Sequence, residues 1–344
     1  MIKSISLEHK EQWKSCFDNL QNKDFYYSFD YHKLSLEKGE IAELLVYETE
    51  STLILFPIVK RPISSEQYPG YYDITSVYGY AGPIMDKIPD NETIVNFQQE
   101  LSTYFEENKI VAAFFIFFPS YSEIQNQLLN NFGELVNLGK TVYIDLTLSL
   151  EEQKRQYRKS NKSEINQLAK AGVEIKKAET EEEIQRFIEI YWDNMKRVSA
   201  KEYYYFPKEY FHEFLQSDEF ESFVLLAYYE NKIIAGAIFT ISGNIMQYHL
   251  AGTDEHHLKF TPMKLILDKA RLIANEKGLK VLHLGGGIGG SETDSLFLFK
   301  KGFSDYTYLF YIWKSIVNPE IYSNLVAEKG LENNSSSFFP LYRI

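Results

Sequence analysis

The densest group of residues that could do chemistry lies between Val281 and Phe303, in the run VLHLGGGIGGSETDSLFLFKKGF. A short apolar segment is followed there by a glycine-rich loop, a short helical segment and two lysines. Glycines let the backbone approach a ligand closely and adopt positive φ angles. Ordering such a loop costs conformational entropy, so we expect it to bind or position a reacting group.

Dinucleotide binding is the first chemistry that this run could serve, because Gly285, Gly287 and Gly290 have the G-x-G-x-x-G spacing after a predicted strand. A dinucleotide-binding loop opens a βαβ unit with an acidic residue about 20 positions further on, at the following strand. Here the predicted helix after the loop is short, and no such unit follows it. The context therefore argues against a dinucleotide.

A metal site is the second possibility, since imidazole and acidic side chains gather around one polar stretch: His249, Asp254, Glu255, His256, His257 and, further on, His283. The stretch has no H-x-x-x-H or C-x-x-C frame, and adjacent histidines cannot share one face of a helix. A polar loop explains the pattern more simply, and we predict no bound metal.

Acyl chemistry is the remaining possibility, by a covalent or a direct route. Ser291 and Ser295 lie beside the glycines without the G-x-S-x-G frame of a nucleophile elbow, and Cys16 lies on an amphipathic helix, where we expect it in the core. Direct transfer to an amine needs only two aligned substrates and a donor that stabilises the oxyanion on the acyl carbonyl. A backbone N–H or Lys300 could supply that donor, although the residues alone do not select this reading.

The composition indicates a folded globular protein of 344 residues, long enough for two domains, with 44% hydrophobic and 24% charged residues. A net charge of −12 argues against DNA and general nucleic-acid binding, so any polyanion must meet a local basic patch. The single cysteine, Cys16, is typical of a reducing compartment. Neither a membrane-spanning apolar run nor a signal-peptide core is evident, and we expect a cytoplasmic protein.

The elements that must position these residues are predicted to form the same succession twice. Apolar periodicity and turn residues give helices, a hairpin, another strand, a long helix, a buried strand and a closing strand in each half. The two hairpins, at 42–60 and 223–241, share a pattern without sharing identity. We therefore predict an α/β (α+β) chain that arose by duplication, with domains at residues 1–148 and 149–344.

Local signals refine this outline at three positions. Ser149 and Glu152 have the spacing of a capping box, and Thr261 is predicted to be the N-cap of a long helix with Pro262 at its first position. Pro57 predicts an edge position or a bulge in the second strand of the first hairpin.

As a combined pattern, these stretches resemble the Fem-type (FemABX-like) transferases of the GNAT acyltransferase superfamily. The resemblance rests on L-H-L-G-G-G at 282–287 followed by D-S-L-F-x-F-K-K-G-F at 294–303. It extends upstream through YRKSNKSEINQLAKAGVEI, YWDNMKRVSAKEYYYFPKEYF and KIIAGAIFTISGNIMQYHLAGT. It covers roughly residues 150–313, whereas the first half is similar more loosely, through Tyr80-Ala-Gly-Pro83 and Asp86.

The resemblance implies two tandem GNAT-like domains, each a mixed, mostly antiparallel sheet flanked by helices, with a cleft between them. The best-known members of the family transfer amino acids from aminoacyl-tRNA to a peptide amine of a peptidoglycan precursor. By position, Lys300 and the preceding Phe299 match the family's catalytic pair, in which the lysine polarises the acyl carbonyl and holds the developing negative charge. Arg197 matches a phosphate-binding arginine, and Tyr248 matches an acceptor-site tyrosine.

Further substrate-binding candidates come from the looser parts of the resemblance and from a basic run at 154–162. The glycines are expected to clear the space where acyl donor and acceptor meet. The basic run could face tRNA or a nucleotide diphosphate, or it could be an ordinary solvated helix face. The residues that we expect at the substrate site in this way are Lys33, Tyr80, Gly285, Gly286, Gly287, Arg158 and Lys162.

Two departures from the family pattern bear on the substrates. Phe118-Pro119 stands where peptidoglycan members have an Asp-Pro, and the two-helix arm of some members is absent, so a different amine acceptor is plausible. Ordinary GNAT proteins bind the coenzyme A pyrophosphate through glycines at a helix N-terminus. The corresponding helix here follows Thr261 and is preceded by Asp254 and Glu255, which argues against acetyl-CoA bound in that manner.

We therefore expect an acyl- or aminoacyl-transferase that forms an amide on an amine of a cell-envelope precursor, of peptidoglycan or polysaccharide type. The acceptor would be a small molecule or linked to a lipid or nucleotide. No cofactor is expected, and the donor would be either aminoacyl-tRNA or acyl-CoA. Two alternatives stay open: a CoA-dependent N-acyltransferase acting on an amino sugar, and a GNAT-like binding protein without turnover.

Overall fold

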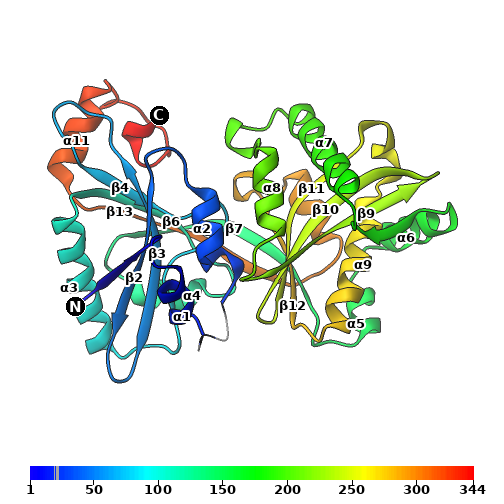
Figure 1. The fold of residues 1–344 in the computed structure, drawn as a ribbon, viewed down its shortest axis with the longest axis horizontal. Coiled ribbons are helices and arrows are strands. Elements are labelled where there is room, and N and C mark those ends of the chain that lie inside the picture. Colours follow the sequence, from blue (N-terminus) through cyan, green and yellow to red (C-terminus); the bar gives the residue numbers. More distant parts are fainter. Residues whose placement is uncertain (19, 21–22) are drawn as a thin grey trace. The chain divides into compact units, whose positions relative to one another are not determined.

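Two compact units make up the chain, and they are described here from a computed structural model (Figure 1). The described residues are 1–18, 20 and 23–344. The first unit contains residues 1–139 and 309–344, and the second contains residues 140–308. No helix in the described part of the chain is both long and apolar enough to cross a membrane.

These units differ from the predicted domains, whose division lay between residues 148 and 149. The second unit begins earlier, at Lys140, and the C-terminal part of the chain returns to the first unit. The return is made by β13 (Thr307–Ile316), which is antiparallel to β6 (Ile110–Ile116) from Ile312 onward. Because β6 is a buried strand of the first unit, β13 and the residues after it belong to that unit as well.

The first unit is a mixed sheet with helices packed against it. Its neighbouring strands are antiparallel except β4 and β6, which are parallel. In sheet order they are β1 (Lys3–Ser6), β2 (Ile41–Glu48), β3 (Leu53–Pro62), β4 (Tyr72–Thr75), β6 and β13, with β5 (Ile84–Met85) beside β3. Its α-helices are α1 (Lys10–Cys16), α2 (Phe29–Ser35), α3 (Asn91–Glu107), α4 (Ser122–Leu129) and α11 (Pro319–Glu328).

Pro57 shows how one sequence signal was wrong in its details. It lies on β3, which is an interior strand, and it pairs with Leu44 of β2. On the other side of β3, Ile54 and Leu55 pair with β5, whereas pairing with β4 starts only at Val59. Pro57 falls between these two stretches, where β3 pairs with neither β4 nor β5, so a proline is tolerated in this interior strand.

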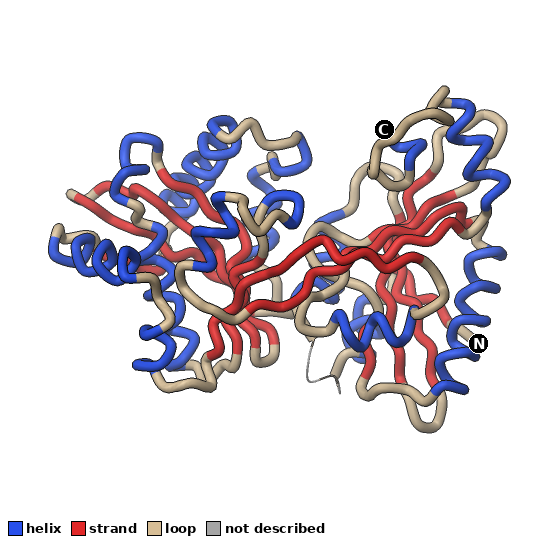
Figure 2. The backbone as a smooth tube through the Cα atoms, turned by 180° about the vertical axis from the view of Figure 1, so that it is seen from behind, coloured by secondary structure: helices blue, strands red, loops and turns tan. Residues whose placement is uncertain are grey.

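The second unit is also a mixed, mostly antiparallel sheet flanked by helices, so the predicted fold class is confirmed for both units (Figure 2). In sheet order its strands are β7 (Glu134–Asp145, from Lys140 onward), β12 (Val281–Gly285), β11 (Ile245–Thr253), β10 (Lys232–Ser242), β9 (Glu221–Tyr229) and β8 (Glu174–Lys177). Its α-helices are α5 (Leu150–Arg155), α6 (Lys159–Lys170), α7 (Glu181–Arg197), α8 (Lys208–Leu215), α9 (Met263–Glu276) and α10 (Ser295–Lys301).

Alternation along β10 separates the two helical layers of this unit. Gly236 faces Phe187 of α7, and a Cβ there would lie 2.5 Å from the Phe187 ring. The neighbouring Ala235 and Ala237 point to the opposite face, where they join the core that includes Leu267 of α9. The sheet is therefore buried on both faces, as its near-continuous apolar strands predict.

Capping signals were read correctly at one helix and wrongly at another. Ser149 and Glu152 form the predicted capping box of α5. Thr261, in contrast, is not the N-cap of α9. Its φ is 50°, in the left-handed region that β-branched residues avoid, and Pro262 occupies the N-cap position.

Candidate active site

A fork in the sheet of the second unit defines the candidate site. The parallel strands β11 and β12 pair only from Ile245–Val281 to Gln247–His283. Beyond that point β11 continues to Thr253, whereas β12 ends at Gly285 and the chain enters the glycine loop. Beyond this point the two strands no longer pair with each other.

The glycine loop is built to pack closely against α10. Gly285 has a φ of 78°, which favours glycine. A Cβ on Gly287 would lie 2.5 Å from Oδ2 of Asp294 and 2.8 Å from Cβ of Phe297, so only glycine fits there. The glycines thus allow the loop to lie against the start of α10. Their predicted role of clearing space for substrates stays a prediction.

Lys300 is buried beside this loop and is only 8% exposed. Its Nζ donates a hydrogen bond of 2.7 Å to the carbonyl of Gly286 and lies 5.8 Å from the centre of the Tyr248 ring. Burial lowers the pKa of Lys300 to about 8, against the opposing effect of the Asp294 charge. The lysine therefore remains mostly protonated at neutral pH, yet it can lose its proton readily.

Tyr248 is a second predicted site residue, besides Gly286, that the fold brings next to Lys300. It lies on β11 immediately after the last pair of the fork and is half-buried. Burial raises the pKa of its hydroxyl, which stays neutral. Among the residues that the structure describes, this hydroxyl makes no hydrogen bond, so it is available to a substrate. Phe299, the other predicted catalytic residue, packs edge-on against Phe303 at 5.6 Å.

His283 and Gln247 form a buried pair at the fork that our sequence reasoning missed. They are 3% and 2% exposed, and Nδ1 of His283 lies 2.6 Å from Oε1 of Gln247. Burial, assisted by the nearby Lys300 charge, lowers the pKa of His283 to about 3, so this histidine is neutral. The sequence did contain a signal for this pair, since each of two apolar strands carries one polar residue. Polar groups buried in a strand usually have a hydrogen-bonding role.

Arg197, Arg158 and Lys162 belong to the same unit but do not contact Lys300 within the described part of the chain. Arg197 is exposed at the end of α7 and donates to Oδ1 of Asn194 at 2.5 Å. Arg158 is exposed, and its backbone N–H donates to the carbonyl of Gly302, just after α10, at 2.9 Å. The basic run therefore adjoins the end of the helix that carries Lys300.

Lys33 and Tyr80 lie in the first unit and are described with it alone. Lys33 is exposed on α2. Tyr80 is half-buried among aromatic side chains, with its ring centre 5.7 Å from that of Phe310 and 6.3 Å from that of Phe118. Their predicted contacts with a substrate stay predictions.

The start of α9, where a phosphate could have bound, already holds an anion of the protein. Oε2 of Glu164 accepts hydrogen bonds from Oγ1 of Thr261 at 2.8 Å and from Nζ of Lys264 at 2.7 Å. The hydrogen bond from Lys264 lowers the pKa of this carboxyl, and the one from Thr261 adds to the effect. Glu164 thus remains charged beside the helix end that would otherwise attract a phosphate.

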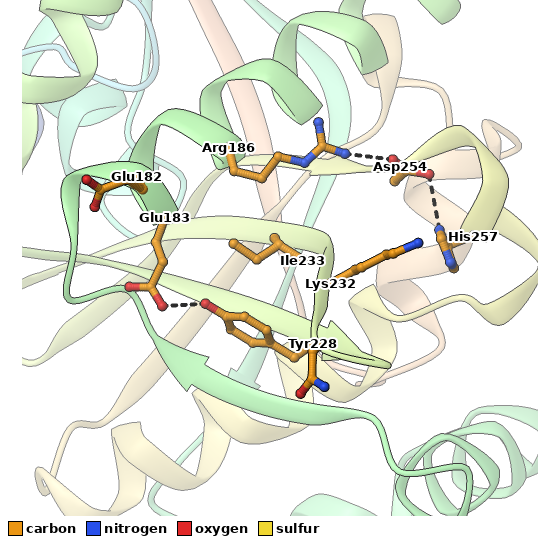
Figure 3. A pocket seen from close by; sticks show the side chains of 9 residues that line it. Glu182, Glu183, Arg186, Tyr228, Lys232, Ile233, Asp254 and His257 are labelled. Atoms are coloured by element: carbon orange, nitrogen blue, oxygen red, sulfur yellow. Dashed lines mark hydrogen bonds and ion pairs between the residues drawn. The ribbon is translucent and has the colours of Figure 1, made fainter.

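A separate pocket lies beside the turn between β9 and β10 and the start of α7 (Figure 3). Its charged groups are mostly satisfied by one another: Asp254 accepts from Arg186 at 2.9 Å and lies 3.1 Å from Nδ1 of His257. Glu183 accepts from the Tyr228 hydroxyl. Within the described residues, no group of three or more His, Cys, Asp or Glu side chains is arranged to hold a metal ion.

Comparisons with known proteins agree with this architecture. Residues 155–293 match the family described as "Acetyltransferase (GNAT) domain". A search of curated proteins finds none with a significant match in sequence. The predicted resemblance to Fem-type proteins is confirmed at the level of the fold, because the crystal structure of FemX matches with a TM-score of 0.71 and 13% identity, over 94% of this chain and 99% of that one.

Two further solved structures share the fold. L-PGS from Bacillus licheniformis matches with a TM-score of 0.57 and 12% identity, over 93% of this chain and 96% of that one. A tandem GNAT protein from the clavulanic acid biosynthesis pathway, solved without AcCoA, matches with a TM-score of 0.52 and 8% identity. That match covers 93% of this chain and 99% of the other, which agrees with two GNAT-like units in succession.

Proposed function

We propose that this chain, which carries a GNAT acetyltransferase domain and has the fold of FemX, is an acyl- or aminoacyl-transferase acting on an amine of a cell-envelope precursor. The observation that carries the proposal is the buried ammonium of Lys300, held by the Gly286 carbonyl and lying over Tyr248 at the fork of β11 and β12. A desolvated cation is suited to stabilise charge that develops on an acyl oxygen.

In the proposed reaction the neutral amine attacks the acyl carbonyl directly. The new C–N bond forms as the carbonyl oxygen becomes negative, and Nζ of Lys300 donates a hydrogen bond to that oxygen. Collapse of the tetrahedral intermediate breaks the bond to the leaving group. The amine nitrogen loses a proton, and the leaving oxygen or sulfur gains one. Tyr248 is proposed to orient the acceptor through its hydroxyl, and Arg197 is proposed to bind an acceptor phosphate.

The donor in this proposal is an aminoacyl-tRNA. Glu164 places a negative charge at the start of α9, which would repel the diphosphate of coenzyme A. The basic run with Arg158 and Lys162 adjoins the end of α10 and offers positive charge to a phosphate backbone in an otherwise acidic chain.

A second candidate is a CoA-dependent N-acyltransferase that acts on an amino sugar. The observation that favours it is the match of residues 155–293 to an acetyltransferase family. This reading requires coenzyme A to bind without a phosphate at the start of α9.

A donor screen tests the proposal. Charged tRNAs and acyl-CoAs are offered with amine acceptors of the peptidoglycan and amino-sugar classes, and amide product is measured by mass spectrometry. We expect transfer from charged tRNA. Transfer from acyl-CoA alone would establish the second candidate, and binding without transfer from any donor would overturn both.

Lys300→Ala is the decisive variant within that screen. We expect kcat/KM to fall by on the order of 100- to 1000-fold, the usual cost of losing an oxyanion donor. Lys301→Met is the matched control, because the Lys301 ammonium contacts Asp305 and the Ser304 carbonyl rather than the loop, and it should keep most of the activity. Full activity of Lys300→Ala would remove Lys300 from the mechanism.

A further inference from the structure

We infer that Asp294 is a positioning residue for Lys300, which fixes the glycine loop that holds the lysine and supplies the negative charge that keeps it cationic. The inference rests on the proposed function for its catalytic meaning. Its structural part stands on the contacts of the loop and of α10.

One oxygen of Asp294 joins two segments of the chain. Oδ2 accepts hydrogen bonds from the backbone N–H groups of Leu296 at 2.9 Å and Phe297 at 3.0 Å, in the first turn of α10. The same oxygen accepts a hydrogen bond from the N–H of Ile288, in the glycine loop, at 3.2 Å. An ordinary N-cap satisfies only its own helix, so the third bond is an additional tie between loop and helix.

The hydrogen bond from Ile288 to Asp294 is one of a series of contacts that connects Asp294, through the glycine loop, to Lys300. Gly287 lies so close to Asp294 that any side chain at that position would collide with the carboxylate. The preceding Gly286 carbonyl accepts the hydrogen bond from Nζ of Lys300 at 2.7 Å. Asp294 at the start of α10 and Lys300 near its end therefore hold the same three-residue stretch of loop, Gly286–Ile288. Without the carboxylate, the carbonyl that orients the ammonium is no longer fixed.

The charge of Asp294 acts on the same lysine. The titratable groups that face Lys300 are His283 on β12, which is neutral, Tyr248 on β11, whose hydroxyl is neutral, and Asp294 on its own element. Burial lowers the pKa of Lys300, and the negative charge of Asp294 raises it. Asp294 is therefore the group that opposes loss of the proton from the buried ammonium.

Two substitutions separate the tie from the charge. Asp294→Asn keeps an oxygen that can cap α10 and accept from Ile288 but removes the charge, whereas Asp294→Ala removes both. Asp90→Asn is the matched control, because Asp90 caps α3 in the first unit through the N–H of Thr93 at 2.8 Å. Thermal unfolding monitors whether each variant is folded.

The first readout needs no substrate. Competitive labelling with acetic anhydride over a range of pH, read by mass spectrometry at Lys300, gives the titration of that amine. We expect the midpoint of Asp294→Asn to lie at lower pH than in the wild type and in Asp90→Asn. A midpoint equal to that of the wild type in folded Asp294→Asn would overturn the electrostatic part of the inference.

The second readout is transfer activity. The alkaline limb of kcat/KM should move to lower pH in Asp294→Asn, because the protonated lysine is the active form. Asp294→Ala should lose on the order of 100-fold in kcat, the cost of misplacing a catalytic group by about 1 Å. Wild-type kcat in folded Asp294→Ala would overturn the positioning role. If the labelling shift occurs while no donor gives transfer, the proposed function fails and the link between Asp294 and Lys300 stands.

Discussion

Lys300 combines two properties that seldom occur together in one side chain. Its ammonium is almost fully buried, yet its partners are a carbonyl and an aromatic ring rather than a carboxylate in direct contact. A buried cation without a paired anion is costly, and proteins keep such groups where they have a task. The neutral His283 and Gln247 beneath it fit this picture, since they bring no negative charge that would neutralise the lysine.

Tyr248 permits a residue-scale test that separates folding from function. Because its hydroxyl makes no hydrogen bond among the described residues, Tyr248→Phe should change the free energy of unfolding by less than about 0.5 kcal/mol. If the hydroxyl orients the acceptor, kcat/KM should fall by about 2- to 12-fold, the worth of one hydrogen bond. Urea unfolding and acceptor-dependent kinetics measure the two effects.

Tyr157→Phe provides the contrast for that test. The Tyr157 hydroxyl is buried between Asp268 and Arg271, at 3.0 Å from each. Its removal leaves two buried charged groups short of a partner, so unfolding should become easier by about 1–3 kcal/mol. Equal stabilities of the two variants would contradict the hydrogen-bond assignments at both tyrosines.

Among the helices and strands, apolar periodicity and turn residues predict most of the elements that the structure shows. Both hairpins, the long helices and the buried strand before the glycine loop were predicted, because each extends over enough residues for its apolar pattern to be unambiguous. The predicted site pair Lys300 and Tyr248 is adjacent in the structure, but that came from the family resemblance. Spacing alone does not reveal which strand lies over which helix.

What could not be predicted depends on contacts between distant segments. Thr261 has the residue type and position of an N-cap. Its hydroxyl instead donates a hydrogen bond to Glu164, far away in sequence, and Thr261 adopts a left-handed conformation. The glycines looked like a cradle for a ligand, whereas Gly287 is needed for the approach of Asp294. The return of the chain end to the first unit likewise rests on long-range contacts, namely the pairing of β13 with β6 and an ion pair of Asp73.

The ion pair of Asp73 with Arg343, near the end of the chain, leads to a testable prediction about the stability of the first unit. Asp73 of β4 is fully buried and accepts from Nε of Arg343 at 2.7 Å and from Nε of Arg61 at 2.7 Å. Arg343→Met removes one of these partners from a buried carboxylate, so the first unit should lose about 1–3 kcal/mol of stability. Arg155→Met is the control, since that side chain is exposed and makes no ion pair among the described residues. A change below about 0.5 kcal/mol in both would show that the chain end does not stabilise the unit.

At the scale of the whole molecule, the two units share an order of elements but not their chemistry. Each has a hairpin, a strand, a long helix and a strand parallel to the earlier one. In the first unit the segment after β6 is fastened: Oε1 of Gln125 accepts from the N–H of Phe118, and Nε2 donates to the carbonyls of Ala81 and Pro83. In the second unit the corresponding segment is the glycine loop with Lys300. The candidate reaction centre described above therefore lies in the second unit.

Three histidines whose pKa is lowered by burial should make the folded state of both units less stable as the pH falls. Burial lowers the pKa of His32, in the first unit, to about 4, and the pKa values of His249 and His283, in the second, to about 3. Above the ordinary histidine pKa of 6.5 these groups are neutral in both the folded and the unfolded chain. As the pH falls below that value, only the unfolded chain takes up the protons, so the folded state loses stability.

The loss should begin well before the acidic side chains contribute. Each histidine lowers the free energy of unfolding by about 1.4 kcal/mol per pH unit between its unfolded and folded pKa values. Carboxyl groups whose pKa is lowered by hydrogen bonds in the fold, such as those of Glu43 and Glu164, have an ordinary pKa of 4.5 and reduce the stability of the protein only below that pH. Urea unfolding at about pH 7, 6 and 5 should therefore show falling stability in both units, with the steeper fall in the second. His32→Gln should flatten the fall in the first unit alone, and a pH-independent stability over this range would show that the three histidines are not held neutral by the fold.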